Sequence, residues 1–373
     1  MDRVQDRLQR ELQARAEAGA LRKLQVHAGL VDLASNDYLG FARDAQLRRM
    51  VEEEIKTLPA LGSGGSRLLT GNNDYVETIE KEIAAFHAAE SALFFNSGYE
   101  ANSGLLSTVV HRHDIILYDA LIHASLREGI RLSGAKAYSF AHNDMQELAH
   151  LLHSHSGNVF VVTESVFSMD GDLAPLLDIA DLCECHQAAL IVDEAHATGV
   201  IGARGEGLVQ QLGLQNRCFA RVHTFGKAMG SNGAVVMGSK LLRDYLINYC
   251  KPFIYTTAPN YLQLAAVRMA YQYLAEQEAP RQQLQSNLQH MRTLLQTSAL
   301  QPVSTDSAIF SFIIPGNDRV RTVAASLRDH GYDLRPIMSP TVPAGSERIR
   351  ICVHAFNSPD ELSAVIKLFQ PII

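Results

Sequence analysis

The chain has 373 residues, of which 47% are hydrophobic and 20% charged, so it can build more than one hydrophobic core. Its formal net charge of -7 argues against nucleic-acid binding, which needs a basic stripe. Five cysteines without disulfide-scaffold spacing and a charged N-terminus unlike a signal peptide predict a cytoplasmic protein, and no stretch reaches the ~20 apolar residues of a membrane span.

The first 42 residues are predicted to form a helix and an arm. Their apolar spacing predicts an amphipathic helix over residues 1–23, with one face formed by Val4, Leu8, Leu12 and Leu21. A helix over residues 45–58 should end before Pro59. The glycine-dense loop of residues 62–71 then exposes backbone amides that an anion could approach, although a plain connector explains the glycines equally well.

Residues 43–270 are predicted to form the large catalytic domain. After a helix over residues 75–87, short apolar runs alternate with helical patterns, which is typical of a mainly parallel, doubly wound α/β sheet. Seven strands are expected, at residues 92–95, 114–117, 136–139, 159–163, 189–192, 219–223 and 234–237. In such a sheet the functional groups lie in the loops that follow the strands.

Residues 271–373 are predicted to form a smaller α+β domain. A helical region over residues 261–300, interrupted near Pro280, leads into it. Its expected strands span residues 308–314 and 348–353, and its expected helices span residues 319–330 and 359–369. The intervening segment of residues 335–345 is too rich in proline for a helix and suits a rigid wall over a site.

Three reactive side chains follow neighbouring predicted strands. Asp193 and His196 come directly after a continuous apolar run, and Lys227 follows the next run along the chain. Pyridoxal phosphate enzymes need a lysine for a Schiff base, a carboxylate for the pyridine nitrogen and a hydrogen-bonding group near the ring hydroxyl. A surface lysine after a strand is the simpler interpretation of Lys227 alone, so the hypothesis depends on all three residues together.

Other interpretations of these motifs are weaker. Asp193-Glu-Ala-His196 also spells a helicase box, but no phosphate-binding Gly-Lys-Ser/Thr loop precedes it. A dinucleotide-binding enzyme would need a glycine fingerprint after a strand, which the chain lacks. The run Cys183-Glu-Cys185-His186 lies in a helical pattern with no second ligand pair at finger spacing, so we predict no metal site.

Several longer motifs resemble the α-oxoamine synthases, pyridoxal phosphate enzymes with the aspartate-aminotransferase (type I) fold. The resemblance runs from about residue 22 to the C-terminus. It rests on these motifs in the same order: Gly62-Ser-Gly-Gly-Ser-Arg, Asn96-Ser-Gly-Tyr-Glu-Ala-Asn, His123-Ala-Ser, Thr163-Glu-Ser-Val-Phe-Ser-Met-Asp-Gly-Asp, Asp193-Glu-Ala-His-Ala-Thr-Gly, Thr224-Phe-Gly-Lys and Pro340-Thr-Val-Pro-Ala-Gly. The biotin-pathway members, which condense L-alanine with pimeloyl-CoA or pimeloyl-acyl carrier protein, are the most similar.

The resemblance implies catalytic roles for Lys227, His123, Asp193 and His196. Lys227 would hold the cofactor covalently and act as the base on the substrate Cα, and Asp193 would keep the ring nitrogen protonated. His123 would stack on the ring. The implied cofactor-binding set is completed by His196 and Ser168 at the ring hydroxyl, by Ser97, Gly98 and Tyr99 at a helix N-terminus, and by Thr224 at the phosphate.

The resemblance also implies substrate-binding residues. Arg350 would bind the alanine carboxylate, with Asn36 as a helper, and Arg348 competes for this role because strand alternation sends the two arginines to opposite faces. Arg22 and Thr341 would face the acyl substrate or product. Where biotin-pathway members have Arg-Pro-Pro, this chain has Met338-Ser-Pro, and Arg335 stands three residues upstream.

The resemblance also bears on the oligomeric state and leaves several related activities as alternatives. The family's site is built at a dimer interface, so the resemblance implies a homodimer. Sister activities with other amino acids and acyl thioesters are alternatives, among them those of 2-amino-3-ketobutyrate CoA ligase, 5-aminolevulinate synthase and serine palmitoyltransferase. A non-catalytic binding protein of the same fold is another.

Overall fold

The computed structural model describes residues 3–24, 26 and 29–372, and their contacts form two compact units. The large unit comprises residues 36–168 and 173–282, and the small unit comprises residues 169–172 and 283–372 together with the described residues before Asn36. This grouping differs from the predicted segments 1–42, 43–270 and 271–373. The reason is that Val31 and Asp32 pair with Tyr332 and Asp333, which brings the N-terminal arm into the small unit.

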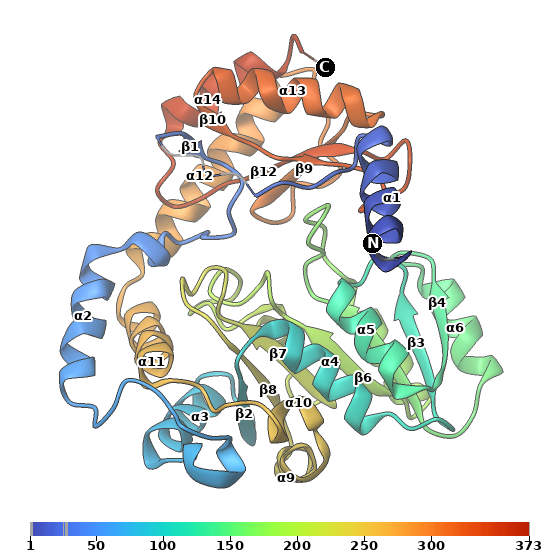
Figure 1. Ribbon diagram of the computed structural model, residues 1–373, viewed down its shortest axis with the longest axis vertical. Coiled ribbons are helices and arrows are strands. Elements are labelled where there is room, and N and C mark those ends of the chain that lie inside the picture. The colour runs from blue at the N-terminus through green and yellow to red at the C-terminus, as the bar shows by residue number, and fades with distance from the viewer. Residues whose placement is uncertain (1–2, 25, 27–28, 373) are drawn as a thin grey trace. The chain divides into compact units, whose positions relative to one another are not determined.

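A seven-stranded sheet organises the large unit, and it confirms the predicted mainly parallel architecture (Figure 1). The strand order is β2-β8-β7-β6-β5-β3-β4; β8 is antiparallel to both of its neighbours and the other pairs are parallel. The strands are β2 (Ser91–Phe95), β3 (Ile115–Asp119), β4 (Lys136–Phe140), β5 (Val159–Glu164), β6 (Ala189–Asp193), β7 (Ala220–Thr224) and β8 (Ala234–Gly238).

The helices of the large unit connect these strands. Several begin at side-chain caps: Ser97 Oγ accepts from Glu100 N at the start of α4, and Asp144 caps α6. The elements are η1 (Phe41–Arg43), α2 (Ala45–Lys56), η2 (Arg67–Gly71), α3 (Asp74–Phe86), α4 (Gly98–Val109), α5 (Ala124–Ser133), α6 (Met145–Ser154), α7 (Leu176–Cys185), α8 (Leu208–Gln211), α9 (Lys240–Tyr249), α10 (Lys251–Ile254) and α11 (Tyr261–Glu276); α12 (Ala279–Gln296) begins here.

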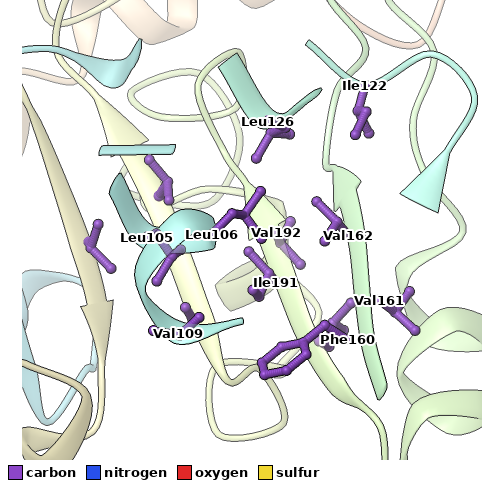
Figure 2. Packing of buried hydrophobic residues seen from close by; sticks show 14 of the residues in the cluster. Leu105, Leu106, Val109, Ile122, Leu126, Phe160, Val161, Val162, Ile191 and Val192 are labelled. Carbon is purple, nitrogen blue, oxygen red and sulfur yellow. The ribbon is translucent and has the colours of Figure 1, made fainter. Parts of the chain in front are cut away.

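The core of the large unit lies between the sheet and its covering helices (Figure 2). Leu105 and Leu106 of α4 and Leu126 of α5 are fully buried with Val162 of β5 and Ile191 of β6. Strands β5 and β7 are buried along their whole lengths and β6 from its second residue on, as expected of strands covered on both faces. The rigid central strands therefore fix the positions of the loops that follow them.

The small unit contains an antiparallel three-stranded sheet in the order β11-β12-β9. Its elements are α1 (Arg3–Glu17), β1 (Val31–Asp32), β9 (Ile309–Ile313), α13 (Asn317–Asp329), β10 (Tyr332–Asp333), β11 (Pro336–Ile337), β12 (Arg348–Cys352) and α14 (Pro359–Phe369). The predicted strands and helices of this region are confirmed to within three residues at each end. Strand β11 was not predicted, because two residues, one of them proline, carry no alternating pattern.

Two expectations about the N-terminal part need correction. The predicted helix over residues 1–23 ends at Glu17, because the chain turns at Gly19 with a positive φ; residues 1–2 lie outside the described residues. The glycine-dense loop is not wholly irregular, since Arg67–Gly71 form a π-helical turn. Arg67 is buried there, with its Nη1 atom 2.8 Å from Glu80 Oε1.

No helix within the described ranges is long and apolar enough to cross a membrane.

Candidate active site

A cavity of about 230 Å³ opens where the central strands of the large unit end. Asp193 reaches it from the end of β6, and Thr224 and Lys227 reach it from the end of β7 and the turn beyond. The wall consists of Asn36, Gly98, Tyr99, Asn102, His123, Ser125, Glu164, Asp193, Ala195, His196, Thr224, Gly226, Lys227, Asn232 and Gly233. A crevice at the carboxyl ends of parallel strands is the usual ligand site of this architecture.

Asp193 is held in place from two sides. The side-chain amide of Asn102 on α4 donates to Asp193 Oδ2 at 2.6 Å, and the backbone N–H of Ala195 donates to Oδ1 at 2.8 Å. The residue is only 4% exposed. Hydrogen bonds to both oxygens fix the position and orientation of this carboxyl group at the cavity wall.

His123 begins α5 and is linked to Asp193 through two side chains. Ser125 Oγ lies 2.8 Å from His123 Nδ1, and the Asn102 amide donates to the same Ser125 oxygen at 3.0 Å. Removal from water lowers the pKa of His123; the positive charge of Lys227 lowers it further, whereas Asp193 opposes the shift. The imidazole is therefore neutral near pH 7, as a ring that stacks on an aromatic ligand should be.

Glu164 is a second carboxyl group in the wall. It ends β5, and its Oε1 atom accepts from the backbone N–H of His123 at 2.5 Å. Burial raises its pKa well above the ordinary value, and the neighbouring charge of Asp193 raises it further. The cavity wall thus contains two neighbouring carboxyl groups, and burial disfavours the charged form of Glu164.

Thr224 offers the cavity a hydroxyl group that has no hydrogen-bond partner among the described residues. Thr224 Oγ1 is buried, and none of the described residues forms a hydrogen bond with it. Gly98, the first residue of α4, approaches this threonine so closely that a Cβ atom there would lie 2.5 Å from Thr224 Cγ2. A helix N-terminus beside an unpaired hydroxyl is well suited to an anion such as a phosphate.

His196 is positioned by a residue that the sequence analysis did not single out. The Tyr38 hydroxyl lies 2.7 Å from His196 Nδ1 in a buried contact. The Tyr38 hydroxyl thus helps to fix the orientation of an imidazole that lines the cavity.

Most of the predicted site residues of the large unit line this one cavity. Ser97 and Ser168 do not belong to the wall that the described residues form; Ser97 caps α4, and the role of Ser168 stays a prediction. The residues of the glycine-dense loop also lie outside this wall.

Four polar wall residues were missed, namely Asn102, Ser125, Glu164 and Asn232, as were Ala195, Gly226 and Gly233. Asn102, Ser125 and Glu164 stood inside motifs quoted for the resemblance, but a polar residue within a helix or beside another carboxylate carries no signal of which way it faces. Only the pairing of Glu164 with Asp193 across β5 and β6 brings the two carboxyl groups together.

The predicted acyl-chain and carboxylate residues lie in the small unit. Arg22 Nη2 donates to Thr341 Oγ1 at 3.0 Å, so these two predicted partners are in contact. Arg348 is buried and forms an ion pair with Asp170. Arg350, two residues further along β12, is half-buried.

Comparison with known proteins identifies the class. Residues 28–369 match the family model "Aminotransferase class I and II", so the chain belongs to this family. A variant of serine palmitoyltransferase from S. paucimobilis, solved with a pyridoxal phosphate adduct of myriocin, is 26% identical with a TM-score of 0.90 over 100% of this chain and 98% of that chain.

Two curated relatives are more similar in sequence. The 8-amino-7-oxononanoate synthase of Emericella nidulans is 42% identical over 98% of this chain and 94% of its own length. The protein of that name from Lysinibacillus sphaericus is 38% identical over 99% of this chain and 98% of its own length.

The cofactor of this fold is pyridoxal 5'-phosphate, and the cavity fits it. The unpaired Thr224 hydroxyl and the α4 N-terminus suit the phosphate, and the Asp193 carboxylate suits a protonated ring nitrogen. Lys227 in the same wall is the amine that a pyridoxal aldehyde requires.

Proposed function

We propose that the protein is an 8-amino-7-oxononanoate synthase of biotin biosynthesis, an acyltransferase that condenses L-alanine with a pimeloyl thioester and releases carbon dioxide and the free thiol. The observation that carries the proposal is the cavity that gathers Lys227, Asp193, His123 and His196 in a chain 42% identical to such an enzyme over nearly its full length.

The wall residues divide the catalytic work. Bound pyridoxal phosphate supplies an electron-withdrawing ring that weakens the bonds at the alanine Cα. The Lys227 amine would remove the Cα proton, and Asp193 would stabilise the positive charge on the ring nitrogen. His123 would pack on the ring face, while His196 and Ser168 would hydrogen-bond the ring hydroxyl.

Cofactor binding uses the helix and strand ends described above. Ser97, Gly98 and Tyr99 form the start of α4, and Thr224 donates its hydroxyl to the phosphate. Gly98 is required because a side chain there would displace the threonine.

The proposal also assigns residues to the substrate. We assign the alanine carboxylate to Arg350, with Asn36 as helper, because the charge of Arg348 is already neutralised by Asp170. Arg22 and Thr341, which contact each other, bind the acyl chain.

A homodimer in the cytoplasm is part of the proposal. Leu61, Leu69 and Tyr255 are between 73% and 81% exposed although they are large and apolar. They flank one backbone junction, where Ala258 N donates to Gly65 O and Tyr261 N donates to Leu61 O. Exposed apolar side chains in and near the glycine-dense loop suit contact with a second copy of the chain.

The test is a substrate panel read by thiol release. L-alanine, glycine and L-serine are each combined with pimeloyl-, acetyl-, succinyl- and palmitoyl-CoA. We expect kcat/KM for alanine with pimeloyl-CoA to exceed every other pair. The structural similarity to serine palmitoyltransferase makes serine with palmitoyl-CoA the main competitor, and a higher value for that pair would replace the proposal with the sister activity.

A further inference from the structure

Asn102 and Ser125 are buried polar residues of the cavity wall to which the proposed reaction assigns no role. They lie on neighbouring helices of the large unit, Asn102 on α4 and Ser125 on α5, and are 2% and 1% exposed (Figure 1). The two helices approach closely at Gly129, where a Cβ atom would lie 3.0 Å from the carbonyl oxygen of Asn102. This close packing brings the Asn102 side chain within hydrogen-bond distance of Ser125.

The hydrogen bonds of Asn102 determine which way its amide faces. Its Nδ2 atom donates to Asp193 Oδ2 at 2.6 Å and to Ser125 Oγ at 3.0 Å, so both amide protons are used. The opposite orientation would bring the amide oxygen against the carboxylate oxygen of Asp193 with no proton between them. Asn102 therefore donates to the Ser125 oxygen, and the Ser125 hydroxyl proton needs another acceptor.

That acceptor is the Nδ1 atom of His123. His123 is the N-cap of α5, and its Nδ1 atom accepts from the backbone N–H of Ser125 at 3.2 Å. Because a backbone N–H can only donate, Nδ1 carries a lone pair rather than a proton. The Ser125 hydroxyl, 2.8 Å from the same nitrogen, must then donate as well. Nδ1 thus receives two hydrogen bonds, and the single proton of the neutral imidazole lies on Nε2.

We propose that Ser125 is a positioning residue that holds His123 in the neutral form with its proton on Nε2, and that Asn102 acts through Ser125 by orienting its hydroxyl. Protonation of Nδ1 would break both of its hydrogen bonds. For its catalytic consequence the inference rests on the proposed function and deepens it. A single amide, that of Asn102, fixes both the carboxylate assigned to the ring nitrogen and the imidazole assigned to the ring face.

Other ionisable groups also act on His123. Removal from water and the charge of Lys227 lower its pKa, whereas Asp193 raises it. The ionisable groups that share the cavity wall with His123 are Tyr99, Glu164, Asp193, His196 and Lys227. Ser125→Ala changes none of these groups and leaves the backbone N–H of residue 125 in place, so it isolates the contribution of the hydroxyl.

The experiment is nitrogen-15 NMR of the histidine rings in the purified holoenzyme, with the His123 signals assigned by their absence in His123→Asn. In the wild type, the chemical shift of Nδ1 should be that of an unprotonated ring nitrogen and the shift of Nε2 that of a protonated one. In Ser125→Ala, the pKa of His123 should rise by roughly one unit, the equivalent of one ordinary hydrogen bond. The acid limb of the kcat/KM profile for alanine with pimeloyl-CoA should move to higher pH by the same amount.

Ser103→Ala is the matched control. Ser103 is a buried serine of α4 that does not line the cavity, and its hydroxyl donates to the Tyr99 carbonyl. This variant should leave the pKa of His123 unchanged. Asn102→Ala should raise that pKa in the wild-type background, but it should add nothing in the Ser125→Ala background, because its effect passes through the hydroxyl.

Three results would overturn the inference: a proton on Nδ1 in the wild type, an unchanged pKa of His123 in Ser125→Ala, or an equal shift in Ser103→Ala. A further rise when Asn102→Ala is added to Ser125→Ala would show that Asn102 does not act through Ser125. The NMR measurements need no turnover. Wild-type protein that is inactive with alanine and every thioester would therefore refute the proposed function and leave the assignment of the His123 proton standing.

Discussion

Strands β6 and β7 carry two polar clusters one residue apart, and only one of them can reach a ligand. Asp193 and Thr224 line the cavity, whereas their neighbours Glu194 and His223 are 0% exposed. Successive side chains of a strand point to opposite faces, so the same two strand ends supply both clusters. The two clusters contain similar charged and polar residues. They differ in that one lines the cavity and the other is fully buried.

The buried cluster is held by protein groups. Glu194 Oε1 accepts from the backbone N–H groups of Leu208 and Val209, and His223 Nδ1 lies 2.9 Å from Thr198 Oγ1. Burial raises the pKa of Glu194 to about 7 and lowers the pKa of His223 well below its ordinary value. The side chains of Glu194 and His223 bond to neighbouring loop residues and are not accessible to a substrate. We therefore expect substitutions in this buried cluster to change stability rather than the rate of the reaction.

The largest expected effect belongs to the cavity cluster. Lys227→Ala removes both the covalent anchor for the cofactor and the base, so turnover should fall at least about a thousandfold. The pyridoxal absorbance of the purified protein should be lost as well. Exposed Lys240 provides the control, because Lys240→Ala removes the same charge from α9 without touching the cavity. An active, coloured Lys227→Ala protein would refute the role of Lys227 as covalent anchor and base.

A smaller effect separates the two neighbouring carboxyl groups. Asp193→Asn keeps the size of the side chain but removes the negative charge, and kcat should fall roughly 100-fold, as when one preorganised electrostatic group is lost. The Kd for pyridoxal phosphate should rise. Glu194→Gln, one residue away, should leave both quantities near the wild-type values. If kcat falls equally in Asp193→Asn and Glu194→Gln, the accessible and the buried cluster do not differ in their role in catalysis.

The sequence predicted the cavity residues that follow strands, because a reactive side chain after an apolar run stands out. Lys227, Asp193 and His196 were found in this way. Asn102 and Ser125 were not, since each is one polar residue within a helix and its partner lies far away in sequence. Contacts of that kind are set by how α4 and α5 pack together, which spacing along one element does not reveal.

In the small unit, too, helices could be predicted from the sequence but side-chain contacts could not. Helix α13 was predicted nearly to its true ends, and Met338 was noted as a departure from the family motif. Their contact could not be predicted, because it depends on the turn at Gly19 and on the hydrogen bonds between Asn317 and Ser339. Secondary structure was therefore more predictable than the contacts between side chains.

The smallest expected effect is a change in how stability depends on pH. The pKa of Glu194 is about 7 in the folded protein and about 4.5 when unfolded, so between these values the folded state binds more protons. The free energy of unfolding must then decrease as pH rises from 4.5 to 7, by up to roughly 3 kcal/mol from this group. Glu194→Gln cannot ionise and should lose that decrease.

Urea denaturation of wild type and Glu194→Gln at pH 5 and pH 7.5 measures the difference. His87 acts in the opposite direction, because burial lowers its pKa to about 3 and stability falls as pH drops below 6.5. Both proteins contain His87, so subtracting one curve from the other isolates Glu194. If the free energy of unfolding changes equally with pH in both proteins, Glu194 is ionised in the folded protein at neutral pH. The buried cluster would then carry a negative charge, as the cavity cluster does.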